Sequence, residues 1–303
     1  MKRLIFAALI CVCAVGCAAP KPAETTEATP NMQTTAVAEP TLQTVTEVLP
    51  PETAAEVTLA TATETTTITT TAETTTEVTM YLPPAYSEKE LKNQAKDAKA
   101  NGTLTVIIDP GHGIADPGAM HSANLGDTTE AILDMAIARK LETELVNRGY
   151  TVVFTHDGVT KPATEWDDGK AVFGPSERCS FANEQDAQLF ISLHCDAYPQ
   201  NDTVNGVRIY YPVNTPYSTS LDKKYAKAVS AAVDKAFPDA KDPTLMAMYG
   251  EECYTVLYKT RVPSLLVECG FITNLTDAQN LLSEDWQTAF AVALANGIDA
   301  YFE

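Results

Sequence analysis

Two histidines and two glutamates stand out as residues that could do chemistry together: His112, Glu130, His194 and Glu268. Imidazole nitrogens and carboxylate oxygens are ligands that catalytic zinc sites use, and such sites keep one of four tetrahedral positions open. Two histidines and one glutamate would leave that position for water or substrate. These residues are far apart in the chain, so only the fold could bring them together.

Each of the three candidate ligands also has a purely structural interpretation. His112 lies in the turn sequence Asp109-Pro110-Gly111-His112-Gly113, where an imidazole can simply complete the turn. Glu130 stands at the start of an expected helix, where a carboxylate complements the helix dipole. His194 ends the apolar run 189–193, and a single histidine at a strand end is often only structural. Both interpretations stay open at this level.

Glu268 follows the apolar run 265–267, so its carboxylate is expected at the end of a buried strand. Burying an unpaired charge costs several kcal/mol, so the carboxylate should either form an ion pair or have a functional role. A salt bridge to a buried arginine such as Arg178 is the structural alternative. The functional interpretation is a general base and acid beside a metal, which takes a proton from water and passes it to a leaving nitrogen.

The elements that must position these groups alternate between short apolar runs and helical stretches. Continuous apolar runs are typical of strands covered on both faces. The expected strands are Leu104 to Asp109, Thr151 to Thr155, Leu189 to His194, Gly206 to Tyr211, Tyr254 to Tyr258 and Ser264 to Glu268. The expected helices are Ser87 to Ala100, Thr129 to Arg148, Pro175 to Gln185, Tyr217 to Ala236 and Asp285 to Phe302.

This alternation predicts an α/β fold: a mostly parallel twisted sheet of about six strands with helices on both faces. Ligands of such sheets bind beyond the carboxyl ends of the strands. The expected strands end at Asp109, shortly before His112, and at His194 and Glu268. The fold class therefore predicts that the candidate groups meet at one edge of the sheet.

Residues 1–17 have the pattern of an export signal. Lys2 and Arg3 precede an apolar run, 4–15, that is too short to span a bilayer. Ala14-Val15-Gly16-Cys17 resembles a lipobox, which predicts cleavage before Cys17 and a lipid on its sulfur, although Ala14 stands where leucine is usual. Ordinary cleavage with free secretion, or a retained signal anchor, are the alternatives.

Residues 18–84 are rich in Thr, Glu, Ala and Pro and have almost no aromatic side chains. Such a segment buries too little apolar surface to offset the entropy of ordering it, so we expect a disordered tether before a catalytic domain at 85–303. The tether contributes nine glutamates against the single Lys21 to the net charge of -19. No cluster of Lys and Arg offers a phosphate-binding face, which argues against a nucleic-acid partner.

The domain contains five motifs: IIDPGHGIADPGAM at Ile107 to Met120, the helix start Glu130-Ala131-Ile132-Leu133, RCSFAN at Arg178 to Asn183, SLHCDA at Ser192 to Ala197, and PSLLVECGFITN at Pro263 to Asn274. With these motifs in this order, the sequence from about Leu104 to Phe302 resembles the amidase type-3 family, the zinc-dependent N-acetylmuramoyl-L-alanine amidases.

The resemblance implies that His112, Glu130 and His194 bind one zinc ion per chain and that Glu268 is the catalytic glutamate. It implies peptidoglycan as the substrate, cut at the amide between N-acetylmuramic acid and L-alanine of the stem peptide. Asp127 and Asp134 are the alternative ligands if the register at Glu130 is wrong. With peptidoglycan as its substrate, the enzyme would work outside the bacterial membrane, either anchored to it only through a lipid on Cys17 or secreted. No protein partner is evident from the sequence.

The sequence departs from the family at His156, where arginine is usual, at Ile114, where a second glycine is usual, and in an extra loop, 157–174. None of these removes a proposed ligand or base. The segment between Tyr211 and Val256 is too short for the inhibitory helix of some family members. We therefore expect an active site that is open without an activator.

Four cysteines fall in the domain: Cys179, Cys195, Cys253 and Cys269. Regular strands would point Cys195 and Cys269 away from the cleft, because they neighbour His194 and Glu268. Buried free thiols are the favoured interpretation. A disulfide in an exported domain and a nucleophilic Cys195 are the alternatives.

Two other classes of function fit the same residues. One is a different exported zinc hydrolase of the wall, a peptidase or deacetylase, which would cut another bond with the same ligands. The other is a wall-attached lipoprotein that binds glycan or peptide without catalysis.

Overall fold

The computed structural model describes residues 84–113, 115–159 and 173–303 of the chain. The expected export signal, Cys17 and all but the end of the expected tether lie outside the described residues. Within the described ranges, no helix combines the length and the apolar character needed to cross a bilayer.

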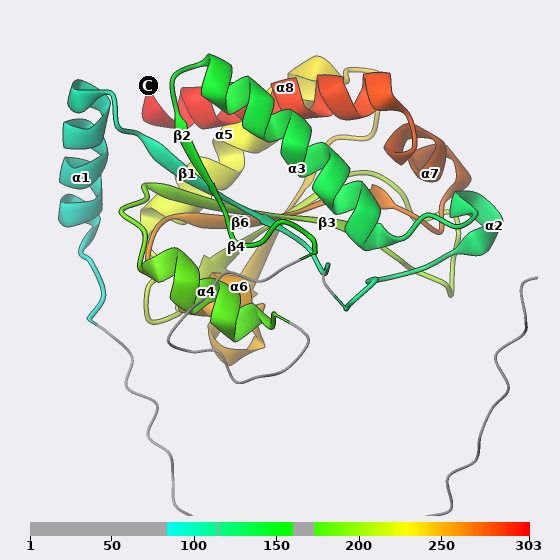
Figure 1. Cartoon of the computed structure of the whole chain (residues 1–303), viewed down its shortest axis with the longest axis horizontal. Helices are drawn as coiled ribbons and strands as arrows, with labels where there is room; N and C mark the ends of the chain where they lie inside the picture. The colour runs from blue at the N-terminus through cyan, green and yellow to red at the C-terminus, as the bar shows by residue number, and fades with distance from the viewer. Residues whose placement is uncertain (1–83, 114, 160–172) are drawn as a thin grey trace, which may run out of the picture. The chain divides into compact units, whose positions relative to one another are not determined.

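A six-stranded sheet forms the centre of the domain (Figure 1), with strand order β2-β1-β3-β6-β4-β5. All neighbouring strands are parallel except β6 and β4, which are antiparallel. The prediction of a mostly parallel sheet of about six strands is confirmed. The strands are β1 (Thr105–Pro110), β2 (Thr151–Phe154), β3 (Leu189–Asp196), β4 (Arg208–Val213), β5 (Thr244–Tyr249) and β6 (Ser264–Phe271).

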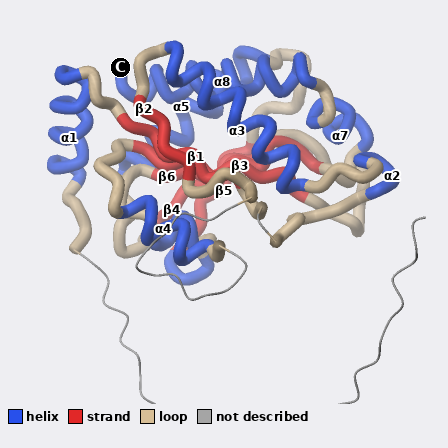
Figure 2. The backbone as a smooth tube through the Cα atoms, in the orientation of Figure 1, coloured by secondary structure: helices blue, strands red, loops and turns tan. Residues whose placement is uncertain are grey.

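Helices cover both faces of this sheet, as expected (Figures 1 and 2). On one face lie α3 (Glu130–Asn147), α5 (Ser220–Ala236) and α8 (Glu284–Phe302), and on the other lie α4 (Pro175–Asn183) and α6 (Thr255–Lys259). The remaining helices are α1 (Glu88–Asn101), α2 (Ser122–Leu125), α7 (Leu275–Leu281) and a short 3-10 turn at Gly250–Glu252.

Alternation along each strand divides the side chains between two cores. Val106 and Ile108 of β1 pack in the core under α3, α5 and α8, whereas Ile107 packs in the smaller core under α4 and α6. In β6, Val267 faces the larger core and Leu266 the smaller one. Successive strand residues point to opposite faces, so Glu268 shares the face of Leu266.

One predicted strand is wrong and one strand was missed. Tyr254 to Tyr258 lies almost entirely in helix α6, where Val256 and Leu257 are buried against the sheet. A short apolar run fits a buried strand or a buried helical turn equally well, so its pattern could not decide. The sequence pattern does not predict strand β5, because its sequence TLMAMY is rich in Met and Ala, which are good helix formers.

All four cysteines of the described ranges are buried and unbridged, in agreement with the favoured interpretation. Cys195 and Cys269 lie in the larger core, on the opposite face of the sheet from Glu268. Burial raises the pKa of the Cys195 thiol well above its usual value. A thiol without solvent access and with a raised pKa is a poor nucleophile.

The contact between α5 and α8 depends on a glycine. A Cβ atom added to Gly297 would come within 2.5 Å of the Cα atom of Val229. We expect Gly297→Ala to lower the free energy of unfolding by about 1–3 kcal/mol, because overpacking outweighs the gain in helix propensity. Urea unfolding measures this, with Ala300→Ser at an exposed position of α8 as the control. Equal stability of Gly297→Ala and wild type would contradict the close approach.

Candidate metal centre

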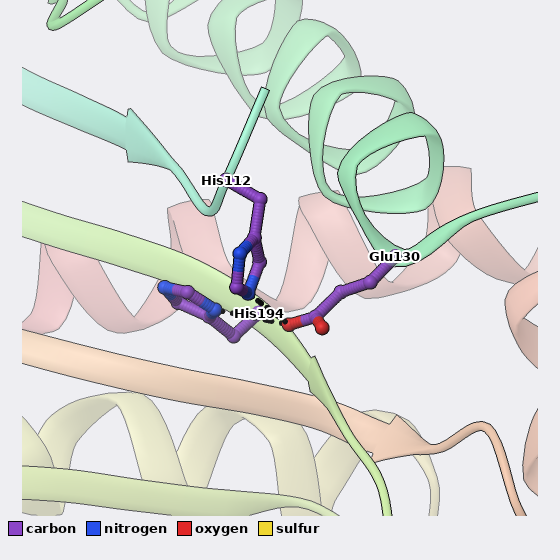
Figure 3. A group of neighbouring side chains, drawn as sticks. All are labelled: His112, Glu130 and His194. Atoms are coloured by element: carbon purple, nitrogen blue, oxygen red, sulfur yellow. Dashed lines mark hydrogen bonds and ion pairs between the residues drawn. The ribbon is translucent and has the colours of Figure 1, made fainter. Parts of the chain in front are cut away.

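His112, Glu130 and His194 come together at one edge of the sheet, and their ligand atoms lie within 4.8 Å of one another. Oε1 of Glu130 is 3.1 Å from Nε2 of His112 and 3.0 Å from Nδ1 of His194. Figure 3 shows both rings directing a nitrogen toward this carboxylate. Two imidazole nitrogens and one carboxylate oxygen at these separations fit a single bound metal ion.

The turn after β1 presents His112. Its backbone has a φ of 57°, a left-handed conformation that non-glycine residues rarely adopt. Nδ1 of His112 donates to Oδ2 of Asp116 at 2.8 Å, and the other oxygen of Asp116 accepts the backbone N–H of Gly118. A carboxylate on the second ring nitrogen fixes the tautomer and the orientation of a metal-binding histidine. Asp116 therefore aims Nε2 of His112 at Glu130.

Glu130 begins α3, and it is buried rather than displayed at the helix start. Its Oε2 atom accepts the backbone N–H of Ala119 at 2.7 Å, and Oε1 accepts that of Cys195 at 3.2 Å. The backbone at Gly118 passes very close to the Glu130 carboxylate, because a Cβ atom added to Gly118 would lie 2.7 Å from Oε2 of Glu130. Complementing the helix dipole would need none of these contacts.

His194 lies in β3, and a polar cluster beneath the site holds the ends of β1 and β3 together. Asp109 accepts the hydroxyls of Thr155 and Ser192, each at 2.7 Å. Arg178 lies 3.3 Å from Asp109 and donates to the carbonyl of Pro110 at 3.0 Å. The structural alternative in which Arg178 pairs with Glu268 is therefore wrong.

His156, which stands where the family usually has arginine, belongs to the same polar cluster beneath the site. Its Nδ1 accepts the backbone N–H of Gly158, so Nε2 carries the proton and donates to the carbonyl of Pro110 at 2.8 Å. Burial lowers the pKa of His156, which keeps the ring neutral. The substitution thus retains a donor to the turn that carries His112.

The charges in the cluster suit a cation. Burial favours the neutral acid of Glu130, but hydrogen bonds with His112 and His194 outweigh it and lower its pKa to about 2. For His112 burial disfavours the charged ring, yet hydrogen bonds with Glu130 and Asp116 raise its pKa. A bound metal would supply the positive partner of Glu130 that a protonated His112 otherwise provides.

Glu268 lies beside this cluster, because its backbone pairs with that of His194 across β3 and β6. Its Oε2 atom is buried and has no hydrogen-bond partner within the described ranges. Burial, followed by the charges of Asp196 and Glu130, raises the pKa of Glu268 well above its usual value. A carboxyl group that holds its proton in this way suits proton transfer, and a nearby metal ion would lower the pKa again.

An open cleft of about 540 Å³ surrounds these groups, a size typical of small-molecule sites. His194 and Glu268 both line this cleft. The cleft also has apolar and aromatic lining residues: Phe173, Pro175, Tyr254, Val256 and Leu266.

The structure separates the alternatives left open by the sequence. Among the described residues the metal-binding group contains neither Asp127, which is exposed, nor Asp134, which is fully buried. Burial raises the pKa of Asp134 well above its usual value, so it is poorly suited to bind a cation. Sequence reasoning missed Asp116 and Asp196, although Asp116 follows His112 by four residues and Asp196 follows His194 by two.

The profile of a protein family described as N-acetylmuramoyl-L-alanine amidase matches residues 106–300. The amidase LytC of Bacillus subtilis is 28% identical over 226 residues, which cover 72% of this chain and 39% of LytC. The amidase AmiA of Escherichia coli is 25% identical over 247 residues, covering 69% of this chain and 80% of AmiA. This chain thus spans less than half the length of LytC.

Solved structures show the same fold. An N-acetylmuramoyl-L-alanine amidase from Clostridium difficile 630 superposes with a TM-score of 0.55 and 25% identity, covering 66% of this chain and 97% of that one. The catalytic domain of CwlV from Bacillus (Paenibacillus) polymyxa gives a TM-score of 0.54 and 26% identity, with 66% and 98% covered.

The raised pKa of His112 makes metal binding depend on pH. The usual histidine pKa is 6.5, and, against the effect of burial, hydrogen bonds with Glu130 and Asp116 raise that of His112, so a proton competes with a metal for Nε2 at a higher pH than it would at an ordinary histidine. Zinc affinity should fall as the pH drops through this raised pKa, by about tenfold per pH unit once His112 is protonated. Calorimetric titration of the full chain at pH 8 and pH 6 tests this. An affinity independent of pH would contradict the ligand role of His112.

Removing the carboxylate that orients His112 should weaken metal binding. We expect Asp116→Ala to lower zinc affinity by about 10–100-fold, the usual effect of losing such a partner. Asp127→Ala, which removes an exposed carboxylate outside the cluster, is the matched control. Equal losses in the two variants would show a general charge effect instead of orientation.

Proposed function

Because the chain belongs to the N-acetylmuramoyl-L-alanine amidase family, we propose that residues 85–303 hydrolyse the amide between N-acetylmuramic acid and L-alanine of peptidoglycan. The observation that carries the proposal is the group of His112, Glu130 and His194 with Glu268 beside it in one open cleft. A module that only binds glycan would have no need of an ionised carboxylate between two histidines.

We propose that His112, Glu130 and His194 hold one zinc ion per chain. The donor set supports this assignment, since two nitrogens and one oxygen leave a tetrahedral position open. When bound, zinc would polarise the amide carbonyl and lower the pKa of water from about 15.7 to about 7. Asp116 keeps His112 in the tautomer that such binding requires.

Glu268 moves the proton in this proposal. It takes a proton from the attacking water and transfers it to the nitrogen of L-alanine, so that the amine leaves in neutral form. The unpaired Oε2 atom is available for both transfers.

The place of action follows from the proposed substrate, which lies outside the bacterial membrane. We propose that residues 1–17 direct export, that Cys17 carries a lipid anchor, and that residues 18–84 tether the catalytic domain to it. Free secretion after ordinary cleavage remains the alternative for this part of the chain. The names of several relatives, such as the probable cell wall amidase LytH of Staphylococcus aureus, agree with action at the wall.

Glu268→Gln tests the reaction and the role of the base together. We expect release of L-alanine amino groups from purified peptidoglycan to require zinc and to fall by about 10²–10⁴-fold in the variant. Zinc binding should persist, because Glu268 is not among the metal ligands. Release of other amino termini would indicate a peptidase, and release of acetate a deacetylase. Zinc binding without any product would indicate a binding module.

A further inference from the structure

Arg208 extends the row of functional residues across the sheet. Backbone pairing places His194 of β3 opposite Glu268 of β6, and Glu268 opposite Arg208 of β4. Paired residues of neighbouring strands lie on the same face, about 4.8 Å apart. Tyr210, two residues after Arg208, confirms the face, because it packs in the core under α4 and α6. Arg208 therefore lies beyond Glu268, on the side away from the metal cluster.

Two contacts fix the guanidinium of Arg208. Nη1 donates to Oδ2 of Asp196 at 3.1 Å, and the group stacks on the ring of Phe271 at 4.6 Å. Asp196 itself lines the cleft. The Arg208 side chain is 31% exposed, and Asp196 is its one hydrogen-bond partner within the described ranges. A guanidinium has five N–H donors, so several remain for a ligand.

The charges around the cleft make this arginine important for an anionic substrate. Asp116, Glu130, Asp196 and Glu268 all line the cleft, and those carboxylates that are ionised would repel an anionic substrate. Arg178 also lines it, but its guanidinium is buried against Asp109 and the carbonyl of Pro110. Arg208 does not itself line the cleft, but its ion pair with Asp196 and its backbone pairing with Glu268 place its positive charge directly beside these acids.

We propose that Arg208 binds a carboxylate of the stem peptide on the leaving-group side of the cut bond, and so selects stem peptides that are acidic next to L-alanine. This inference rests on the proposed function. In that reaction the leaving nitrogen lies at Glu268, so the departing peptide extends toward β4. A residue spans about 3.3–3.6 Å, which places the carboxylate of the residue after L-alanine roughly 6 Å from the leaving nitrogen. Arg208 lies on β4, one strand away from Glu268 on β6, and its long side chain can reach a carboxylate at this distance from the leaving nitrogen.

The test compares two substrates that differ in one group: N-acetylmuramoyl-L-alanyl-D-glutamate and the same compound with its α-carboxylate amidated. We expect the full chain with zinc to favour the free acid by about tenfold in kcat/KM, the usual effect of one charge-assisted hydrogen bond. Arg208→Gln should bring this ratio close to one, and Arg208→Lys should give an intermediate ratio, because lysine keeps the charge but loses the planar fork.

Arg139→Gln is the matched control. Arg139 also pairs with a carboxylate, Glu142 at 3.2 Å, and stacks on an aromatic ring, Phe154 at 4.2 Å, but neither of these partners lines the cleft, whereas Asp196 does. This variant should keep the wild-type ratio and rate. If Arg208 only adjusted Glu268, both substrates would slow equally and the ratio would persist.

A wild-type ratio near one, or an unchanged ratio in Arg208→Gln, would overturn the inference and leave the proposed function intact. If Arg208→Gln does not fold, the wild-type and Arg208→Lys ratios decide alone. Failure of wild type to release an L-alanine amino group from either substrate or from peptidoglycan would overturn the proposed function and this inference with it.

Discussion

The buried carboxylate of Glu130 joins three parts of the chain that meet only in the folded protein. Its Oε1 atom contacts a nitrogen of His112, a nitrogen of His194 and the backbone N–H of Cys195, and its Oε2 atom accepts from Ala119. A buried carboxylate without such partners would be strongly destabilising. The same contacts that satisfy this charge fix the start of α3 against β3 and the turn after β1. The site geometry is therefore inseparable from the stabilisation of one charge.

The strand order arranges the rest of the chemistry around that point. The turn after β1 carries His112, β3 carries His194, β6 carries Glu268 and β4 begins with Arg208, and these strands are neighbours in this order. Because side chains alternate between faces, His194 of β3 and Glu268 of β6 face the cleft while Cys195 and Cys269 face the larger core. Alternation alone thus separates reactive groups from thiols that would be oxidised or bind metal.

Most of the fold could be predicted from the sequence because burial on both faces leaves a strong local pattern. Five of six expected strands and all five expected helices exist, with small shifts at their ends. The failures lie where local pattern is weak: α6 reads as an apolar strand, and β5 has Met and Ala in place of β-branched residues. Both segments take their form from the surface they pack against. The direction of β4 and β5 against β6 also leaves no local signal.

The sequence by itself determined which residues have the chemistry for the site, because His112, Glu130, His194 and Glu268 are recognisable by type, by position at element ends and by their motifs. Only the tertiary structure decided that Glu130 and not Asp134 faces the histidines, that Arg178 pairs with Asp109, and that Asp116 orients His112. The physical reason is that hydrogen bonds and ion pairs act over about 3 Å. Helix rotation and strand register decide which polar atoms come within that distance. Both are set by packing between segments that are far apart in the sequence.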